Sequence, residues 1–259
     1  QVLLGESYKQ VGKYLPEARV IAITDKNVHR YYKDFISQWP VIVIKPGEQN
    51  KTFETLGYII DRLIRLNADR STFILGIGGG IVCDITGFAA SIYMRGLRFG
   101  FISTSLLSQV DASVGGKNGI NFRGYKNMVG VFRQPDFVLC DHTLLKTLAN
   151  HEFITGFAEV IKAAAIRDES FFSWMEANFK AALDQNSDVL QEMIYRSVKI
   201  KAEVVEQDEK ERNLRRILNF GHTFGHALEK VTGISHGEAI SVGMVMAAKL
   251  SEKTGTAPA

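Results

Sequence analysis

The stretch TFILGIGGG, residues 72–80, joins a short apolar run to a cluster of glycines. The run Thr72–Ile77 predicts a buried strand, and the pattern after the glycines predicts a helix over Ile81–Met94. Glycines between a strand and a helix let a phosphate approach the backbone at the helix N-terminus, where negative charge is favoured. The third glycine of a GxGxxG fingerprint would fall on Ile81, so a turn without a ligand is an open alternative.

Similar apolar runs recur through the first half of the chain. They are separated by helical patterns such as Leu56–Leu66, and this alternation predicts a mainly parallel sheet with helices on its faces. The further predicted strands are Val20–Thr24, Val41–Ile44, Phe99–Ser103 and Phe137–Cys140.

The second half has almost no β-branched runs and is typical of helices. We therefore predict an α/β fold with a Rossmann-like domain over residues 1–149, followed by an all-α domain over residues 150–259. The predicted helices of the second domain are Phe153–Ile166, Ser170–Leu183, Ser187–Glu206, Ile217–Val231 and Glu238–Thr254.

The composition excludes several classes of protein. A net charge of +3, from 31 basic and 28 acidic residues without a basic block, argues against a nucleic-acid-binding protein. No apolar run reaches the roughly 20 residues that span a bilayer, and no signal peptide is visible. Cys83 and Cys140 both lie in apolar segments and are expected to be buried hydrophobic residues. A cytoplasmic location without a membrane partner is therefore expected.

Polar residues follow the first two predicted strands. Asp25 and Asn27 follow one of them, and Glu48 and Lys51 follow the other. Ligands of parallel sheets gather beyond the carboxyl ends of strands, and acidic residues there suit ribose hydroxyls. Asp84, one turn into the helix after the glycines, is a further candidate, although each of these clusters alone would also fit a solvated loop.

The polar stretch Thr104–Asn127 is expected to be a loop. It contains Asp111, Lys117 and Lys126, with glycines before Lys117. It does not satisfy the phosphate-loop motif GxxxxGK[ST], because Asn118 follows the lysine. The loop suits a polyhydroxylated anion, and a purely structural glycine-rich loop is the alternative.

The histidines near the end of the chain suggest a metal site. His222 and His226 are four residues apart, so both lie on one helix face, and spacing alone predicts them as a ligand pair. His236 follows, and Glu159 lies far upstream. The basic residues that accompany them, and that a charged helix surface would explain equally well, are Lys162, Lys201 and Arg215.

Taken together, these motifs resemble the 3-dehydroquinate synthase family, in family order over nearly the whole chain. The longest matching block is Leu218–Glu229 (LNFGHTFGHALE). The other blocks are Gly78–Gly80 with Asp84 and Gly87, Tyr93–Gly96, Val110–Lys117, Lys126–Gly130, Gly156–Lys162 and His236–Ala239.

The resemblance implies an NAD-binding α/β domain, a helical metal-binding domain and an active site between them. It also implies a homodimer, NAD and one divalent metal, zinc or cobalt. The expected reaction converts 3-deoxy-D-arabino-heptulosonate 7-phosphate into 3-dehydroquinate and phosphate. It would proceed through transient NAD oxidation, phosphate elimination, reduction and aldol closure, in the shikimate route to aromatic amino acids.

The resemblance also assigns roles to residues. The metal ligands would be Glu159, His222 and His236, which makes His226 a proton-transfer residue rather than a ligand. Residues expected to contact NAD are Asp25, Asn27, Glu48, Lys51, Gly79, Gly80, Asp84, Thr104, Ser105 and Thr147. Residues expected to contact substrate or take part in catalysis are Asp111, Lys117, Lys126, Asn127, Lys162, Lys201, Arg215, Asn219 and His226, with Arg95 supplied by the neighbouring subunit.

Other functions stay open at this point. Another sugar-phosphate cyclase, making an inosose or a valiolone, would share the fold and the metal site. A metal-dependent alcohol dehydrogenase of the glycerol dehydrogenase type would produce NADH, and a non-catalytic binding protein would show no turnover. Family members continue well past position 259, so further helices and a phosphate-binding lysine are expected to be missing from this chain.

Overall fold

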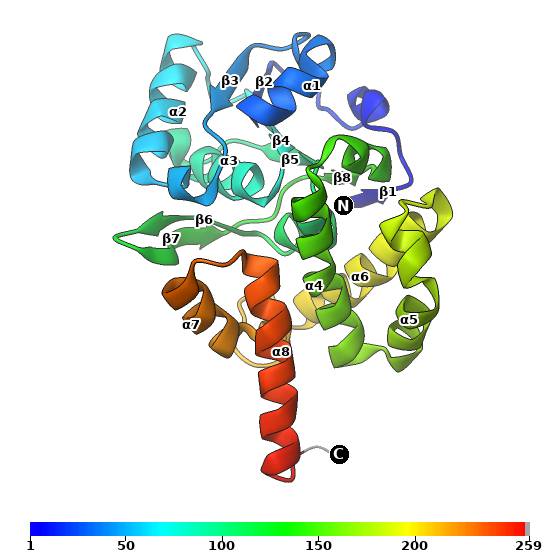
Figure 1. Cartoon of the computed structure of the whole chain (residues 1–259). Coiled ribbons are helices and arrows are strands. Elements are labelled where there is room, and N and C mark those ends of the chain that lie inside the picture. Colours follow the sequence, from blue (N-terminus) through cyan, green and yellow to red (C-terminus); the bar gives the residue numbers. More distant parts are fainter. Residues whose placement is uncertain (257–259) are drawn as a thin grey trace. The chain divides into compact units, whose positions relative to one another are not determined.

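The computed structural model describes residues 1–256, and the chain divides into two compact units, residues 1–148 and 149–259. The first is a parallel sheet with helices and the second is helical, so the predicted fold class is confirmed (Figure 1). The assignment of NAD to one domain and metal to the other stays a prediction. Within residues 1–256, none of the helices has the length and apolar character needed to cross a membrane.

The first unit is built on a six-stranded sheet in the order β1-β8-β5-β4-β2-β3, in which every pair is parallel. Its central strands are fully buried because they carry apolar residues on both faces. The strands are β1 (Val2–Leu4), β2 (Val20–Asp25), β3 (Val41–Ile44), β4 (Phe73–Gly78), β5 (Phe99–Ser103) and β8 (Val138–Cys140).

Helices pack on both faces of this sheet. Val28 and Ile36 of α1 (Lys26–Ile36) pack with Leu75 of β4 on one face. On the other face Gly76 meets Thr86 of α3, where a Cβ would lie 3.2 Å from the threonine methyl. The helices α2 (Phe53–Arg65) and α3 (Gly80–Ile92) complete the long helices of this unit.

The strand order reverses between β2 and β4. The chain passes from β2 to its neighbour β3, whereas β4, β5 and β8 follow one another on the other side of β2. Open α/β sheets bind ligands at such a reversal, beyond the carboxyl ends of the strands. The loops after β2 and β4 are therefore the place in this unit where a ligand is most expected.

The prediction of a loop over residues 104–127 is wrong for its second half. An antiparallel hairpin stands there, formed by β6 (Lys117–Phe122) and β7 (Tyr125–Phe132). The first four residues of β7 are exposed, so no apolar run marked the strand. The short elements of this unit, which were not predicted either, are η1 (Tyr8–Lys13), η2 (Glu48–Asn50), η3 (Tyr93–Arg95), the π-helical turn η4 (Ser108–Ala112) and η5 (His142–Thr147).

The second unit consists of helices, three of which (α5, α6 and α8) have starts capped by side chains. Asp168, Asn186 and Ser235 each accept a backbone N–H of the following first turn. Ser235 and Glu238 form a reciprocal capping box. The elements are α4 (Asn150–Arg167), α5 (Glu169–Leu183), α6 (Ser187–Gln207), η6 (Leu214–Asn219), α7 (His222–Thr232) and α8 (His236–Lys253).

The predicted helix over 217–231 is in fact two elements, because the chain turns at Gly221. This glycine has a φ of 80°, a left-handed conformation that glycine adopts without strain. It also begins a seam along which α7 and α8 touch through their backbones. A Cβ at Gly243 would lie 2.1 Å from the Gly221 carbonyl oxygen, and one at Gly225 would lie 3.1 Å from the Ala239 carbonyl oxygen.

Candidate functional site

The residues predicted to contact NAD gather at one edge of the sheet in the first unit. They follow the carboxyl ends of five strands and surround the reversal between β2 and β4. The sequence placed them in separate loops, and the parallel sheet brings those loops together. In strand order these residues are Asp25 and Asn27 after β2, Glu48 and Lys51 after β3, Gly79, Gly80 and Asp84 after β4, Thr104 and Ser105 after β5, and Thr147 after β8.

The start of α3 forms a cradle for an anion. Gly79 is the N-cap and offers no side chain to the first turn of the helix. A Cβ on Gly79 would lie 3.0 Å from the Ser105 hydroxyl, and one on Gly80 would lie 3.0 Å from the Ala112 methyl. Backbone N–H groups at an uncapped helix start are donors for a phosphate. The bare backbone and the nearby hydroxyl fit the pyrophosphate of a dinucleotide.

Lys51 lies at the centre of a polar network in this unit. Its ammonium group is buried, at 3% exposure for the residue, and forms an ion pair with Asp84. It also donates a hydrogen bond of 2.6 Å to the Asn127 side-chain oxygen. Lys51 therefore links Asp84, which like Lys51 is predicted to contact NAD, to Asn127, which is predicted to contact substrate.

Some candidates at this edge also have a structural partner. Asp25 caps α1 by accepting the Asn27 N–H at 2.7 Å. The Thr147 hydroxyl lies 2.8 Å from that of Tyr32, and the Thr104 N–H donates to the Gly78 carbonyl at 3.0 Å. These contacts hold the loops in place around the strand ends.

The substrate candidates of the first unit are spread more widely. Lys117 begins β6 opposite Phe132, whereas Asn127 lies near the turn of the same hairpin. Asn127 is five residues from Phe132 along β7. At ~3.3 Å per residue it therefore lies about 16 Å along the strand from the position opposite Lys117. Asp111 lies in the turn η4, and Arg95 is exposed in η3 with a φ of 69°.

In the second unit, Glu159, His222 and His236 meet from three different helices. One potential ligand atom from each lies within 4.8 Å of the others. Glu159 Oε1 is 3.7 Å from His222 Nε2 and 3.6 Å from His236 Nε2. The carboxylate is buried on α4, and the two histidines are the first residues of α7 and α8.

These three residues fit a divalent metal such as zinc. Two ligands on a tetrahedral zinc, with bonds of about 2.0–2.1 Å, lie about 3.4 Å apart, close to the separations found. Burial lowers the pKa of His222 below its usual value, although the Glu159 carboxylate opposes this. A helix N-terminus likewise favours a neutral imidazole, which is the form that binds metals.

Spacing alone predicts that His222 and His226 bind one metal together. In the structure these two histidines belong to different groups of potential metal ligands. Their rings are 5.2 Å apart, but His226 groups instead with Glu229 and His236. Helical spacing places two side chains on one face without fixing what lies opposite that face. The partners of His222 come from α4 and α8, which the spacing could not identify.

Buried cations also lie in this unit. Lys162, one turn after Glu159, forms an ion pair with it, and Lys201 and Arg215 are buried on α6 and η6. Asp208 holds the segment before η6 by accepting the N–H groups of Arg212, Asn213 and Arg215. These interactions lower the pKa of Asp208, with the Arg212 N–H contributing most. Buried cations of this kind favour an anionic ligand.

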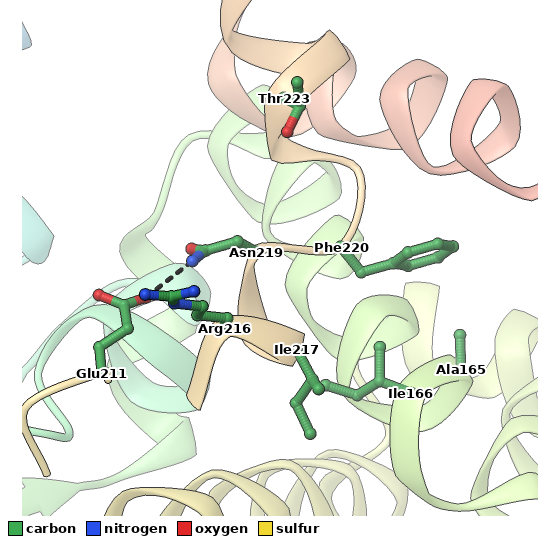
Figure 2. A pocket seen from close by; sticks show the side chains of 8 residues that line it. All are labelled: Ala165, Ile166, Glu211, Arg216, Ile217, Asn219, Phe220 and Thr223. Atoms are coloured by element: carbon green, nitrogen blue, oxygen red, sulfur yellow. Dashed lines mark hydrogen bonds between the residues drawn. The ribbon is translucent and has the colours of Figure 1, made fainter. Parts of the chain in front are cut away.

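Asn219 lies in a pocket of about 780 Å³ within the second unit (Figure 2). Its amide donates a hydrogen bond of 2.7 Å to Glu211. Arg216 and Phe220 also line this pocket. Sequence reasoning missed Glu211 and Glu229, although Glu229 is three residues after His226 and this spacing places both on one helix face.

Comparison with known proteins gives a consistent family. The model described as 3-dehydroquinate synthase N-terminal matches residues 41–155, and the one described as 3-dehydroquinate synthase C-terminal matches residues 156–259. A 3-dehydroquinate synthase of Caulobacter vibrioides (strain NA1000 / CB15N) is 43% identical over 269 residues, covering 99% of this chain and 73% of that protein.

Solved structures of related enzymes have the same fold. A 2-epi-5-epi-valiolone synthase from Streptomyces hygroscopicus subsp. jinggangensis 5008, with NAD+ and Zn2+ bound, aligns with a TM-score of 0.92 and 27% identity, covering 98% of this chain and 75% of that one. A 2-deoxy-scyllo-inosose synthase complexed with carbaglucose-6-phosphate, NAD+ and Co2+ aligns with a TM-score of 0.89 and 29% identity, covering 99% and 74%. The sequence matches, over nearly the whole chain, place this protein in the 3-dehydroquinate synthase family.

Proposed function

We propose that this chain is a 3-dehydroquinate synthase, an NAD- and metal-dependent lyase that converts 3-deoxy-D-arabino-heptulosonate 7-phosphate into 3-dehydroquinate and phosphate. The observation that carries the proposal is the meeting of Glu159, His222 and His236 beside the buried Lys162, in a chain 43% identical to a named synthase. The reaction belongs to the shikimate route to aromatic amino acids.

The cofactors have separate places in this proposal. Glu159, His222 and His236 would hold a zinc or cobalt ion, which supplies Lewis acidity toward the substrate's hydroxyls. NAD, bound at the carboxyl edge of the sheet, supplies a transient hydride acceptor and leaves no net oxidation. Gly79 and Gly80 would receive its pyrophosphate, with Asp84 and Glu48 available for hydroxyl groups.

The chain's own side chains would then bind the anion and move protons. Lys201 and Arg215, both buried, would pair with carboxylate or phosphate in surroundings where charge pairing is stronger than in water. His226 is exposed, and its ring lies 5.2 Å from that of His222 and 6.0 Å from that of His236. We assign it to hold and release a proton at an imidazole nitrogen during phosphate elimination.

A homodimer and a cytoplasmic location are part of the proposal. Arg95 is exposed and, with its neighbour Met94, has a left-handed backbone, with φ values of 69° and 49°. Such strain in two successive non-glycine residues is typical of functional positions. It supports a role for Arg95 at the substrate of a neighbouring subunit.

The test is a phosphate-release assay with the heptulosonate phosphate, with and without EDTA and added NAD. Phosphate should appear without net NADH, and EDTA should abolish its release. Net NADH at the expense of an alcohol would instead favour a dehydrogenase of the glycerol dehydrogenase type. Turnover only of sugar phosphates that lack a carboxylate would favour another cyclase. In a second arm, His222→Ala should lose stoichiometric metal and turnover.

A further inference from the structure

Asn121 occupies an irregular position in the hairpin of the first unit. The register of β6 and β7 shifts between Ile120 and Phe122, so Asn121 has no regular partner across the hairpin. Such irregularities free a backbone group and redirect a side chain. The Asn121 N–H accordingly donates to the Lys51 carbonyl oxygen at 2.8 Å rather than to β7.

The Asn121 side chain makes three further hydrogen bonds, one of them to the Glu48 backbone carbonyl at 3.4 Å. Its amide nitrogen donates to Glu48 Oε1 at 2.7 Å, and its oxygen accepts the Asn127 N–H at 3.0 Å. Asn127 has a left-handed φ of 54°, a conformation that this hydrogen bond helps to hold. One half-buried amide thus contacts the segment after β3 and the tip of the hairpin together.

We propose that Asn121 is a positioning residue that couples the NAD-binding segment Glu48–Lys51 to the substrate-binding end of the hairpin at Asn127. This inference rests on the proposed function, which gives those two segments their ligands. Asn121 orients the Glu48 carboxylate through its amide and fixes the Asn127 backbone through its oxygen. Lys51 closes the network, because its ammonium group contacts both Asp84 and the Asn127 side chain.

The coupling predicts that NAD and the sugar phosphate bind cooperatively. Ordering the segment after β3 around NAD would order the tip of the hairpin, and a sugar phosphate bound at the hairpin would stabilise the same network. By linkage, each ligand should then raise the affinity for the other. In Asn121→Ala this mutual effect should disappear, whereas each ligand should still bind.

A double-mutant cycle on NAD affinity tests the proposal without relying on turnover. NAD binding is measured by calorimetry, in the presence of EDTA, for the wild type, Asn121→Ala, Glu48→Ala and the double variant. Asn121→Ala should weaken NAD binding about tenfold, as expected for a lost hydrogen bond to a charged group. In the Glu48→Ala background it should change the affinity only about twofold, because the hydrogen bond between the two side chains is already absent.

Two more measurements separate positioning from folding. Asn121→Asp keeps an acceptor for the Asn127 N–H but places a negative charge beside Glu48, so it should weaken NAD binding at least as much as the alanine variant. Asn178→Ala, which removes the hydrogen bond that the Asn178 side chain donates to the Trp174 carbonyl oxygen inside α5, is the control and should bind NAD as the wild type does. Thermal unfolding of each variant shows that it is folded.

The outcomes distinguish two failures. If the wild type binds NAD and the Asn121 variants bind it equally well, or if the cycle is additive, the positioning role is wrong and the proposed function stands. If the wild type binds no NAD at all, the proposed function fails and the coupling fails with it.

Discussion

The Glu229 carboxylate lies 3.6 Å from Nδ1 of His236. The other ring nitrogen of His236, Nε2, lies 3.6 Å from the Glu159 carboxylate. A carboxylate in this position favours the tautomer with the proton on Nδ1 and leaves Nε2 as a ligand atom.

We expect Glu229→Gln to weaken binding of Co2+ or Zn2+ by about tenfold, because loss of such a partner typically costs 10–100-fold in metal affinity. Competition with a chromophoric chelator measures this directly. Glu252→Gln, at an exposed position near the end of α8, is the matched control. Unchanged metal affinity in Glu229→Gln would mean that this carboxylate does not orient the ring.

Asp208 should influence substrate binding through Arg215. Its carboxylate accepts three backbone N–H groups between Arg212 and Arg215. Asp208→Asn places an amide N–H₂ against one or more of these donors, so Arg215 should lose its fixed position. We expect the KM for the heptulosonate phosphate to rise roughly tenfold, with kcat little changed, in steady-state phosphate release. Asp188→Asn in the first turn of α6 should leave both constants unaltered, and a fall in kcat at constant KM for Asp208→Asn would contradict the prediction.

The same carboxylate predicts a pH dependence of stability. Backbone donors, the Arg212 N–H first among them, lower the pKa of Asp208 below its ordinary 3.8. An acid with a lowered pKa in the folded state stabilises the fold above its unfolded pKa, and this contribution is lost as the pH falls through the folded pKa. The difference in urea unfolding between wild type and Asp208→Asn should therefore shrink as the pH is lowered from neutral to below 3.8. A difference that stays constant over this range would show that ionisation of Asp208 contributes nothing.

Two glycines in helices should respond to alanine in opposite ways. A Cβ on Gly87 of α3 would lie 1.8 Å from the Asn118 side-chain oxygen, so Gly87→Ala should cost about 1–3 kcal/mol of unfolding free energy by overpacking. Gly57 of α2 has open space around it, so Gly57→Ala should add about 0.5–1 kcal/mol. Urea denaturation measures both, and a stable Gly87→Ala variant would show that β6 is not packed closely on α3.

The two cysteines should be unreactive in the folded protein. Burial raises the pKa of Cys140 to about 12 and raises that of Cys83 further above its ordinary 9.0. Only the thiolate is nucleophilic, so neither should react with a disulfide reagent near pH 8 until denaturant is added. Because the folded state holds these protons more tightly, the free energy of unfolding should fall as the pH rises above about 9. Rapid labelling without denaturant would contradict their burial.

Much of the fold follows from periodicity, and the exceptions have physical causes. The buried strands, such as Phe73–Gly78, carry apolar residues on both faces and were predicted within a residue or two. Helix α1 was missed because most of its residues are polar or exposed. The hairpin was missed because β7 is largely exposed, so its residues form no apolar run.

The site was less accessible to sequence reasoning than the fold. Spacing identifies His222 and His226 as neighbours on a helix, but the grouping of His222 with Glu159 depends on how α7 packs in the second unit. The turn at Gly221 also packs against α8, where a Cβ would meet Met244 at 2.6 Å, and the sequence does not reveal this contact. The contact of Asn121 with Glu48 joins residues 73 apart in the chain, and no local pattern marks it.

The glycine seam between α7 and α8 bears on which ion the proposed site of Glu159, His222 and His236 would accept. Two backbones in direct contact cannot change their separation through a different rotamer, whereas helices held apart by large side chains can. His222 and His236 each begin one of these helices, so the seam fixes the separation of the two backbone positions that carry their rings. A fixed distance suits an ion with bonds of about 2.0–2.1 Å to nitrogen and disfavours Ca²⁺, whose bonds to oxygen are about 2.3–2.6 Å. We therefore expect the proposed site to bind zinc or cobalt in preference to calcium.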